Sequence, residues 1–441
     1  MYCEFAAPCV DAAGTTRRGL FKGAMCLVAG AAVGSGGPNA VCAELTSTVL
    51  NVASFPNLDL SVKVALAGFA KLYPQVKVKL SSLAMADFPT AMTTALAAGA
   101  NLPDVMAMDM EIIGKLAESA GLEDLSQPPF DALRHAAEVP AFALAAARSS
   151  RGALAAFPVD LGPGALFFRA DLLEKSGLAE RDLTTSWDGF IAAGRRLKEK
   201  SGVYLMGNAV DIKDIYIRSS LRDGEGVFFD GQGRVLVETP RFARAFELAK
   251  AARAARIDAR VTVWSSEWVE GIRRGRIASQ MMGSWFGGHL KNWIAPLQTG
   301  QWRAAQLPEG AFAAWGGSFY AVPKQARNKS LAWEFIRYLA LDRDQQMAAF
   351  RAQDSFPSML SVYEDPYFNE PLPYFAGQRA RQLWRDAARR IPAVDADSYD
   401  AVAIDVVNAQ LEQVLEHDKS IPVALSDARQ GIERRVRRRR T

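Results

Sequence analysis

The chain has 441 residues, of which 49% are hydrophobic and 23% charged, with a formal net charge of +4 at pH 7. One domain usually holds about 100–200 residues, so two domains with sizeable cores are predicted. Six positive charges are the arginines within residues 434–440, and the rest of the chain is close to neutral, which argues against a nucleic-acid-binding stripe on the folded part. Residues 434–441 are expected to form a disordered basic tail, with attraction to anionic lipid head groups as the alternative.

The first 43 residues resemble an export signal. Thr16-Arg17-Arg18-Gly19-Leu20-Phe21-Lys22 is a twin-arginine pattern, and an apolar run over residues 23–33 leads to small residues that end at Val41-Cys42-Ala43. The pattern predicts a removable twin-arginine signal peptide over residues 1–43 and a periplasmic mature protein. Two alternatives are a lipid-bearing Cys42 and the basic start of a cytosolic protein. The apolar run is too short to span a bilayer as a helix.

Cysteine and histidine usage predicts that the mature protein carries no cofactor. Cleavage after Ala43 would remove all four cysteines, which are Cys3, Cys9, Cys26 and Cys42. No disulfide, Cys-ligated zinc or iron–sulfur cluster is then expected. His135, His289 and His417 have no metal-ligand spacing, so each is interpreted as a surface or hydrogen-bonded histidine.

Strand-like and helical patterns alternate in the first part of the chain. The expected strands are residues 48–54, 76–80 and 103–108, and the expected helices are residues 60–72 and 88–98. Such alternation predicts an α/β fold with a parallel sheet and helices on both faces.

A second series of elements begins near Phe157. Short apolar runs over residues 157–159 and 165–168 flank the Pro- and Gly-rich segment 160–164. Helices are expected over residues 170–176, 187–200, 241–256 and from Tyr399 to the end, with Thr185-Ser186 as the N-cap signal and Asp188 in the first turn of the second of them. With no internal repeat and no long linker, two packed α/β lobes are predicted.

Several motifs occur in an order that resembles the extracellular solute-binding proteins of ABC importers, specifically the maltose-binding-protein-like family 1 group. They lie at Phe69-x3-Tyr73-Pro74, Ala98-Gly99-x3-Pro103-Asp104-Val105, Phe168-x2-Asp171-Leu172, Thr185-x-Trp187-Asp188, Gly275–Trp285, Trp315-Gly316-Gly317-Ser318 and Asn328-Lys329-x3-Ala332. One departure from the family pattern is Phe168-Arg169-Ala170-Asp171, which stands where the family usually has an aromatic residue followed by Asn-Lys-Asp.

The resemblance implies a two-lobed periplasmic-binding-protein-like fold with several interlobe crossovers and a ligand cleft that closes by hinge motion. Lobe one would comprise residues 44–157 and 313–350, and lobe two residues 158–312 and 351–433. The implied function is that of a monomeric substrate-binding component, which captures a sugar or related polyol and delivers it to the transmembrane permease subunits of an ABC importer.

A sugar-binding site needs carboxylates or amides for the hydroxyl groups and flat rings for the apolar C–H faces. By position against the family pattern, Asp109 and Asp160 are the expected hydroxyl partners, and Trp285 and Tyr399 the expected stacking rings. The other expected ligand-binding residues are Ser54, Phe55, Gly162, Gly316, Gly317 and Ser318. Structural alternatives stay open, such as a strand-end cap for Asp109, a core ring for Trp285 and a tight turn for residues 316–318.

Four further tryptophans are interpreted mainly as core rings, with one of them lining the cleft as the alternative: Trp264, Trp268, Trp302 and Trp315. The rival function is an exported glycoside-acting hydrolase with paired carboxylates. A binding module for a sensor is a third possibility. The sequence contains no Gly-x-Ser-x-Gly, His-Glu-x-x-His or phosphate-binding Gly-x4-Gly-Lys-Ser/Thr motif, so a non-enzymatic function is expected. The sequence does not name the ligand.

Overall fold

The computed structural model describes residues 48–85, 87–395 and 397–440. The predicted signal peptide, its cleavage site and the four cysteines therefore lie outside the described residues. No helix in the described ranges combines the length and the apolar character that a membrane crossing requires.

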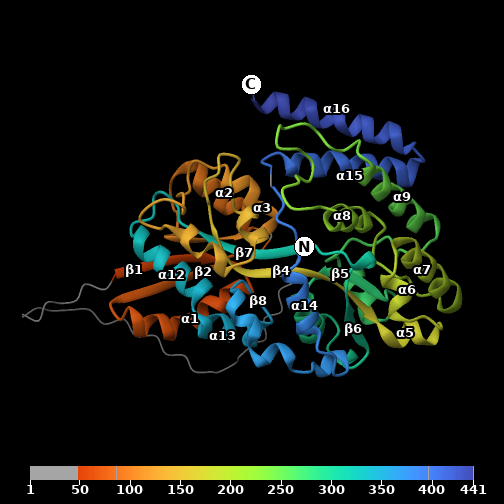
Figure 1. The fold of residues 1–441 in the computed structure, drawn as a ribbon, viewed down its shortest axis with the longest axis horizontal. Helices are drawn as coiled ribbons and strands as arrows, with labels where there is room; N and C mark the ends of the chain where they lie inside the picture. The colour runs from red at the N-terminus through yellow and green to blue at the C-terminus, as the bar shows by residue number, and fades with distance from the viewer. Residues whose placement is uncertain (1–47, 86, 396, 441) are drawn as a thin grey trace, which may run out of the picture. The chain divides into compact units, whose positions relative to one another are not determined.

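The strands form a mixed sheet in the order β2-β1-β3-β7-β4-β5, with β6 and β8 paired to β4 (Figure 1). Their bounds are β1 Thr48–Ser54, β2 Val76–Ser82, β3 Val105–Asp109, β4 Phe157–Arg169, β5 Ser279–Gly283, β6 Trp302–Ala305, β7 Ala314–Ala321 and β8 Phe356–Pro357. The predicted parallel pairing holds for β1 with β2 and β3. It is wrong for β7 and β4, because β7 returns antiparallel to β3 and β4 runs antiparallel to each of its partners.

Strand β4 connects the two ends of the sheet. Its first half pairs with β7, and its second half, Gly164–Phe168, pairs with β5. Within the strand only Asp160 is more than slightly exposed, which explains why the sequence shows a nearly continuous apolar run. The two runs predicted on either side of residues 160–164 are thus one strand, with irregular register between Pro158 and Asp160 and between Leu161 and Pro163.

Helices cover the sheet and build the remaining layers (Figure 1). In the first part of the chain these are α1 Leu58–Leu72, α2 Phe88–Ala98, α3 Met110–Ala117 and α4 Ala141–Ala146. In the middle they are α5 Ala170–Lys175, α6 Glu180–Thr184, α7 Trp187–Ser201, α8 Val210–Ser219, α9 Pro240–Ala254, α10 Ser266–Arg273 and α11 Phe286–His289. The last helices are α12 Lys329–Leu341, α13 Arg343–Gln353, α14 Ala380–Ala388, α15 Asp400–His417 and α16 Ile421–Arg440.

Local signals in the sequence account for several helix boundaries. The Ser186 side chain accepts a hydrogen bond from the Gly189 amide at 3.0 Å, so the predicted N-cap of α7 is confirmed. The predicted C-terminal helix is divided at Asp418, which adopts a left-handed conformation with φ 51°. The prediction of a disordered basic tail is wrong for the described residues, because α16 continues to Arg440. Arginines near a helix C-terminus interact favourably with the helix dipole.

Buried apolar side chains form several cores. One contains residues from β1 to the start of β4 together with β7 and α12, and it lies between Leu50 and Ala340 in the sequence. Two others flank the second half of β4. A fourth is built from α9, α15 and α16. This grouping resembles the expected division into lobes, but the lobe boundaries stay a prediction.

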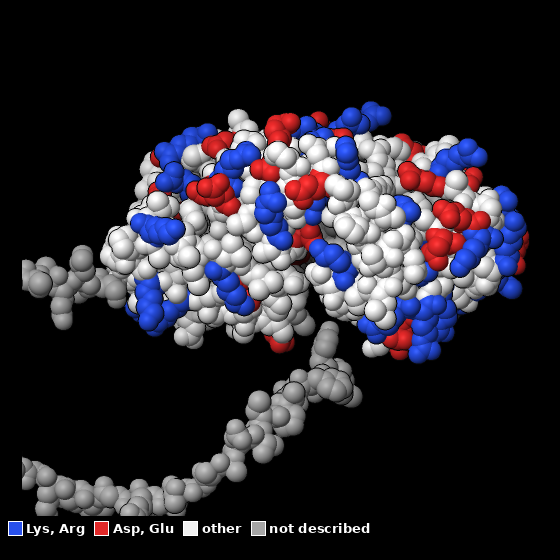
Figure 2. Space-filling view, turned by 90° about the horizontal axis from the view of Figure 1, so that it is seen from below, with Lys and Arg blue, Asp and Glu red and all other residues white. Residues whose placement is uncertain are grey.

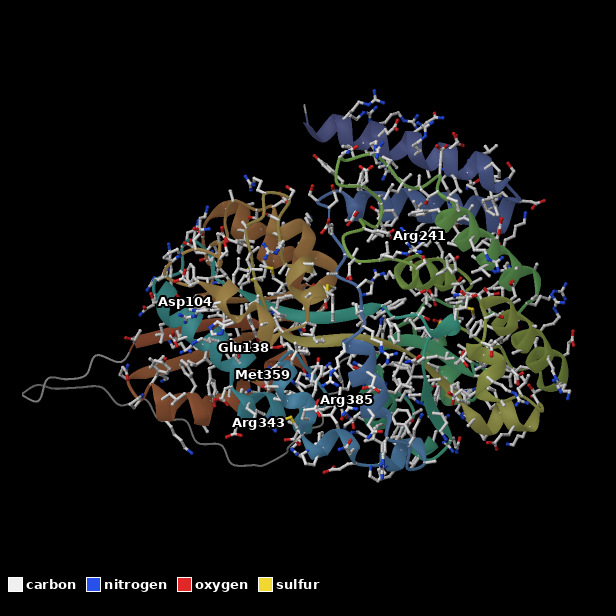
Figure 3. All side chains as sticks on the ribbon, in the orientation of Figure 1. Asp104, Glu138, Arg241, Arg343, Met359 and Arg385 are labelled. Carbon is white, nitrogen blue, oxygen red and sulfur yellow. The ribbon has the colours of Figure 1, made fainter. Side chains whose placement is uncertain are left out.

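Asp104 joins β1 to the turn that follows β7 (Figure 3). Its carboxylate is 3% exposed and accepts hydrogen bonds from the Asn51 amide at 2.8 Å and the Arg327 amide at 3.0 Å. Replacement of Asp104 by alanine leaves both amides without this partner, so we expect the free energy of unfolding to fall by about 2 kcal/mol. Urea denaturation measures the change. The control is Asp188→Ala, because its carboxylate is 75% exposed and its pair with Arg244 should contribute less than about 1 kcal/mol.

Candidate ligand-binding site

The central cavity lies between α3 and α4 on one side and α8, Trp315 and the start of α15 on the other. Its volume is about 510 Å³, which is within the usual range of about 300–1,000 Å³ for a small-molecule site. The residues that line it include Met110, Ile113, Lys115, Phe142, Asp214, Ile217, Arg218, Leu221, Phe228, Trp315, Asp395, Asp397, Asp400, Ile404 and Asp405. These residues come from helices, from strand β7 and from loops that lie far apart in the sequence, so the fold itself creates the cavity.

Part of the lining of the central cavity is apolar and aromatic. Phe142, Phe228 and the indole of Trp315 contribute to it. The guanidinium carbon of Arg218 lies 5.3 Å from the centroid of the Trp315 ring, within the range of a cation–π contact. An indole with a guanidinium beside it offers both a flat apolar surface and hydrogen-bond donors.

Another part of the lining is acidic and comes from the start of α15, the residues just before it and Asp214 of α8. The Asp397 carboxylate accepts a hydrogen bond from the Tyr399 amide at 2.8 Å, and the Asp400 carboxylate accepts one from the Asp397 amide at 3.0 Å. Asp214 forms an ion pair with the fully buried Lys213 at 2.6 Å. Together with Asp395 and Asp405, these groups supply acceptors for hydroxyl or amine donors of a ligand.

Burial raises the pKa of Asp400 to about 7, and the nearby Asp397 charge adds to the rise. The native state therefore holds a proton that the unfolded chain releases near pH 4, so stability should fall as the pH rises from about 4 to about 7. Asp400→Asn removes the ionisation. We expect this variant to match the original protein at pH 3 and to be more stable by about 4 kcal/mol at pH 8. Denaturant unfolding at both pH values measures the difference, and an equal effect at both would contradict the assignment.

Four glycines beside the central cavity allow the strands to approach closely. The Trp285 indole N–H donates to the Trp315 carbonyl oxygen at 2.8 Å. A Cβ atom on Gly162 would lie 1.9 Å from that oxygen, and one on Gly283 would lie 2.4 Å from it. Gly316 and Gly317 have φ values of 72° and 122°, which favour glycine. The crossing of β4, β5 and β7 thus fixes both Trp285 and Trp315.

Seven of the expected ligand-binding residues come together at this crossing. Asp109 of β3 pairs in register with Ser318 of β7, which in turn pairs with Asp160 of β4. The remaining members are Gly162, Trp285, Gly316 and Gly317. Burial raises the pKa of Asp160, while hydrogen bonds from Ser355 and Ser318 oppose the rise. The Ser355 hydroxyl donates to the Asp160 carboxylate at 2.8 Å.

The other three expected residues lie apart from that crossing. Ser54 is fully buried, and its hydroxyl is 3.0 Å from the Tyr320 hydroxyl. Phe55 packs edge-on against Phe88, with the ring centroids 5.4 Å apart. Tyr399 packs against Phe229 at 6.4 Å. None of the ten expected residues lines the central cavity, although chain neighbours of Asp109, Gly316 and Tyr399 do, so contact of the ten residues with ligand stays a prediction.

The four tryptophans with open assignments fall into three groups. Trp268 and Trp302 are fully buried, so their interpretation as core rings is confirmed. Trp315 lines the central cavity. Trp264 is 47% exposed and stacks on Trp285 with 5.9 Å between centroids, so its interpretation as a core ring is wrong. Trp264 lies in the loop before α10. Its exposure could not be predicted from the sequence, because a loop has no helical or strand periodicity.

Three cavity residues were not predicted from the sequence: Arg218, Asp214 and Asp400. The signal for Asp400 was present, since the run Asp395-Ala396-Asp397-Ser398-Tyr399-Asp400 precedes a helical pattern. Arg218 lies on α8, for which no helix was predicted.

The described residues contain no group of three or more His, Cys, Asp or Glu arranged to hold a metal ion. His289 accepts a hydrogen bond from the Trp293 indole at 2.7 Å, and burial lowers its pKa.

The long strands β4 and β7 of the mixed sheet cross between separate cores, and the cavity beside them is lined from both sides. This arrangement defines a two-lobed binding fold. The chain belongs to the family of bacterial extracellular solute-binding proteins, whose pattern matches residues 54–346. Proteins of this family bind solutes.

Individual relatives agree with that assignment. The chain is 27% identical over 357 residues to the lactose-binding protein of Rhizobium radiobacter, covering 77% of this chain and 82% of that protein. It is 24% identical over 286 residues to the arabinooligosaccharide-binding protein of Bacillus subtilis, covering 61% of this chain and 63% of that protein. It also resembles a crystal structure of an extracellular solute-binding protein of family 1, with a TM-score of 0.75, 24% identity and coverage of 88% and 99%. This last likeness is one of fold.

Proposed function

We propose that this protein is the substrate-binding component of an ABC importer, and that it captures a sugar or related polyol in the central cavity and delivers it to a membrane permease. The observation that carries the proposal is the composition of the cavity. The Trp315 indole, Arg218 and a row of aspartates face one volume of about 510 Å³. Sugars combine apolar C–H faces with hydroxyl groups that donate and accept hydrogen bonds, so they suit such a lining.

The relatives support a sugar as the ligand class. One is named for lactose and another for arabino-oligosaccharides. Both names describe small or short carbohydrates, and a cavity of this volume accommodates a molecule of that size. The ten residues expected from the sequence, including Asp160 and Trp285, are proposed to contact the ligand when the lobes close around it.

Closure couples binding to delivery. A ligand that contacts both lobes stabilises the closed form, because it binds that form more tightly than the open form. A difference of about tenfold between the two affinities corresponds to about 1.4 kcal/mol. The permease then distinguishes the closed form of the binding protein from its open form. We further propose that residues 1–43 direct twin-arginine export to the periplasm, where the protein acts as a monomer and leaves the sugar chemically unchanged.

A thermal-shift screen of the purified protein starting at Glu44 tests the ligand class. Ligand that binds only the native state raises the apparent stability, by about 2.7 kcal/mol at a hundredfold excess over Kd. Disaccharides and short oligosaccharides should raise the melting temperature. Amino acids and oligopeptides serve as controls and should leave it unchanged. A shift with amino acids or oligopeptides alone would refute the proposal.

A further inference from the structure

A second cavity lies between the two C-terminal helices. Its volume is about 460 Å³, and it is lined by Val406, Ala409 and Gln410 of α15 and by Asp427, Gly431, Arg434, Arg435 and Arg438 of α16. We call this cavity the basic groove. The helices approach closely here, because a Cβ atom on Gly431 would lie 3.0 Å from the Val406 side chain. Three arginines are therefore held around one concave surface.

The packing of α16 fixes these arginines in place. Ala424, Ala428, Ile432 and Val436 recur every four residues along α16 and are buried in the core that α16 shares with α15 and α9. The two helices lie side by side along their length (Figure 1). Since Val436 is buried in the same turn, the exposed residues Arg434, Arg435, Arg437 and Arg438 belong to an anchored helix end.

Arginines outnumber acidic residues at this end of α16. Asp427, the acidic residue of the basic groove, accepts a hydrogen bond from Lys419 Nζ at 2.6 Å and is thereby neutralised. Glu433 lies 3.4 Å from Arg429 Nη1 and 3.8 Å from Arg437 Nη2. The sequence contains six arginines and no Asp or Glu after Glu433. The face of the molecule shown in Figure 2 differs in charge from this helix end, because basic and acidic side chains are scattered together over that face.

We propose that the basic groove and the adjoining end of α16 bind the phosphate groups of anionic phospholipids at a membrane surface. Guanidinium groups recognise phosphate oxygens in bidentate geometry, and several arginines held together attract an anionic surface more strongly than the same charges dispersed. Such contact would hold the protein at the membrane, where a permease resides. The inference is independent of the sugar proposed for the central cavity.

Co-sedimentation with vesicles tests this inference. The protein should sediment with vesicles of phosphatidylglycerol in phosphatidylcholine and not with vesicles of phosphatidylcholine alone. Added NaCl should weaken the binding, because exposed charges are screened over about 8 Å at physiological ionic strength. The variant R434Q/R435Q should bind the anionic vesicles roughly tenfold more weakly, since each exposed arginine near an anionic surface contributes to attraction.

The matched control is R195Q/R196Q, which changes the charge by the same amount at two exposed, adjacent arginines on α7. It should bind anionic vesicles as the original protein does. Equal weakening in both variants would show attraction by net charge alone and overturn the proposal, as would absence of vesicle binding or stronger binding to duplex DNA. Displacement by millimolar inorganic phosphate would overturn it in favour of a free-phosphate site. Sugar-induced thermal shifts in R434Q/R435Q should remain, which separates this test from that of the central cavity.

Discussion

Gly162→Ala is expected to reduce the free energy of unfolding by about 3–4 kcal/mol, at or beyond the upper end of the usual cost of overpacking. The new Cβ atom would lie 1.9 Å from the Trp315 carbonyl oxygen and 2.9 Å from the Gly316 carbonyl oxygen. Both atoms belong to the backbone of β7, so no side chain can rotate away. Strands β4 and β7 must separate locally.

The same substitution should also lower the affinity for sugar at least tenfold, a change of about 1.4 kcal/mol. The Trp315 carbonyl oxygen accepts the Trp285 indole N–H at 2.8 Å, and the Trp315 ring lines the central cavity. Movement of the β7 backbone therefore displaces two rings at once. Urea denaturation and calorimetric titration measure the two effects separately.

Gly231→Ala is the matched control. No heavy atom lies within 4 Å of a Cβ atom built on Gly231, and its φ is not in the left-handed region. We expect it to leave both stability and affinity unchanged. If Gly162→Ala behaved like Gly231→Ala, the close approach of β4 and β7 would not be the constraint described above.

Trp315→Ala is expected to weaken sugar binding by about 2–3 kcal/mol, or roughly 30- to 150-fold, as for other aromatic anchors in binding sites. The indole forms part of the cavity wall, and Arg218 lies over its face at 5.3 Å. Removal of the ring takes away the apolar surface for a sugar face and the partner that positions the guanidinium. The ring is partly exposed, so stability should change less than affinity.

Two variants separate a ligand contact from a general loss of aromatic surface. Trp315→Phe keeps a flat ring and should recover most of the affinity. Trp293→Ala removes an indole that is 45% exposed and outside the cavity lining, so it should bind sugar normally. Equal losses in Trp315→Ala and Trp293→Ala, measured by calorimetry, would exclude the specific role of Trp315.

Local sequence patterns predicted much of the fold because they report on local structure. The bounds of α2, Phe88–Ala98, agree with the prediction, and the Ser186 cap of α7 was read from adjacent residues. The direction of β7 could not be predicted in this way. Its antiparallel pairing with β3 depends on the path taken by about 200 intervening residues, which neither periodicity nor propensity records.

The sequence motifs mark residues that meet at a strand crossing, but they do not mark the side chains that helices supply to the cavity. Asp160, Gly162 and Ser318 meet because β4 and β7 pair in register. Arg218 reaches the cavity from α8 only through the packing of that helix. The prediction of a disordered basic tail was wrong because it depended on the run of arginines and overlooked the buried apolar residues Ile432 and Val436, which anchor α16.

Calorimetric titration of the purified protein with lactose and arabino-oligosaccharides, followed by chromatography of the recovered sugar, shows whether the protein binds a carbohydrate and leaves it unchanged. We expect saturable binding of one sugar molecule per chain, weakened roughly 30- to 150-fold in Trp315→Ala, with the sugar recovered intact. Absence of binding to any carbohydrate, or recovery of cleaved sugar, would contradict the proposed function.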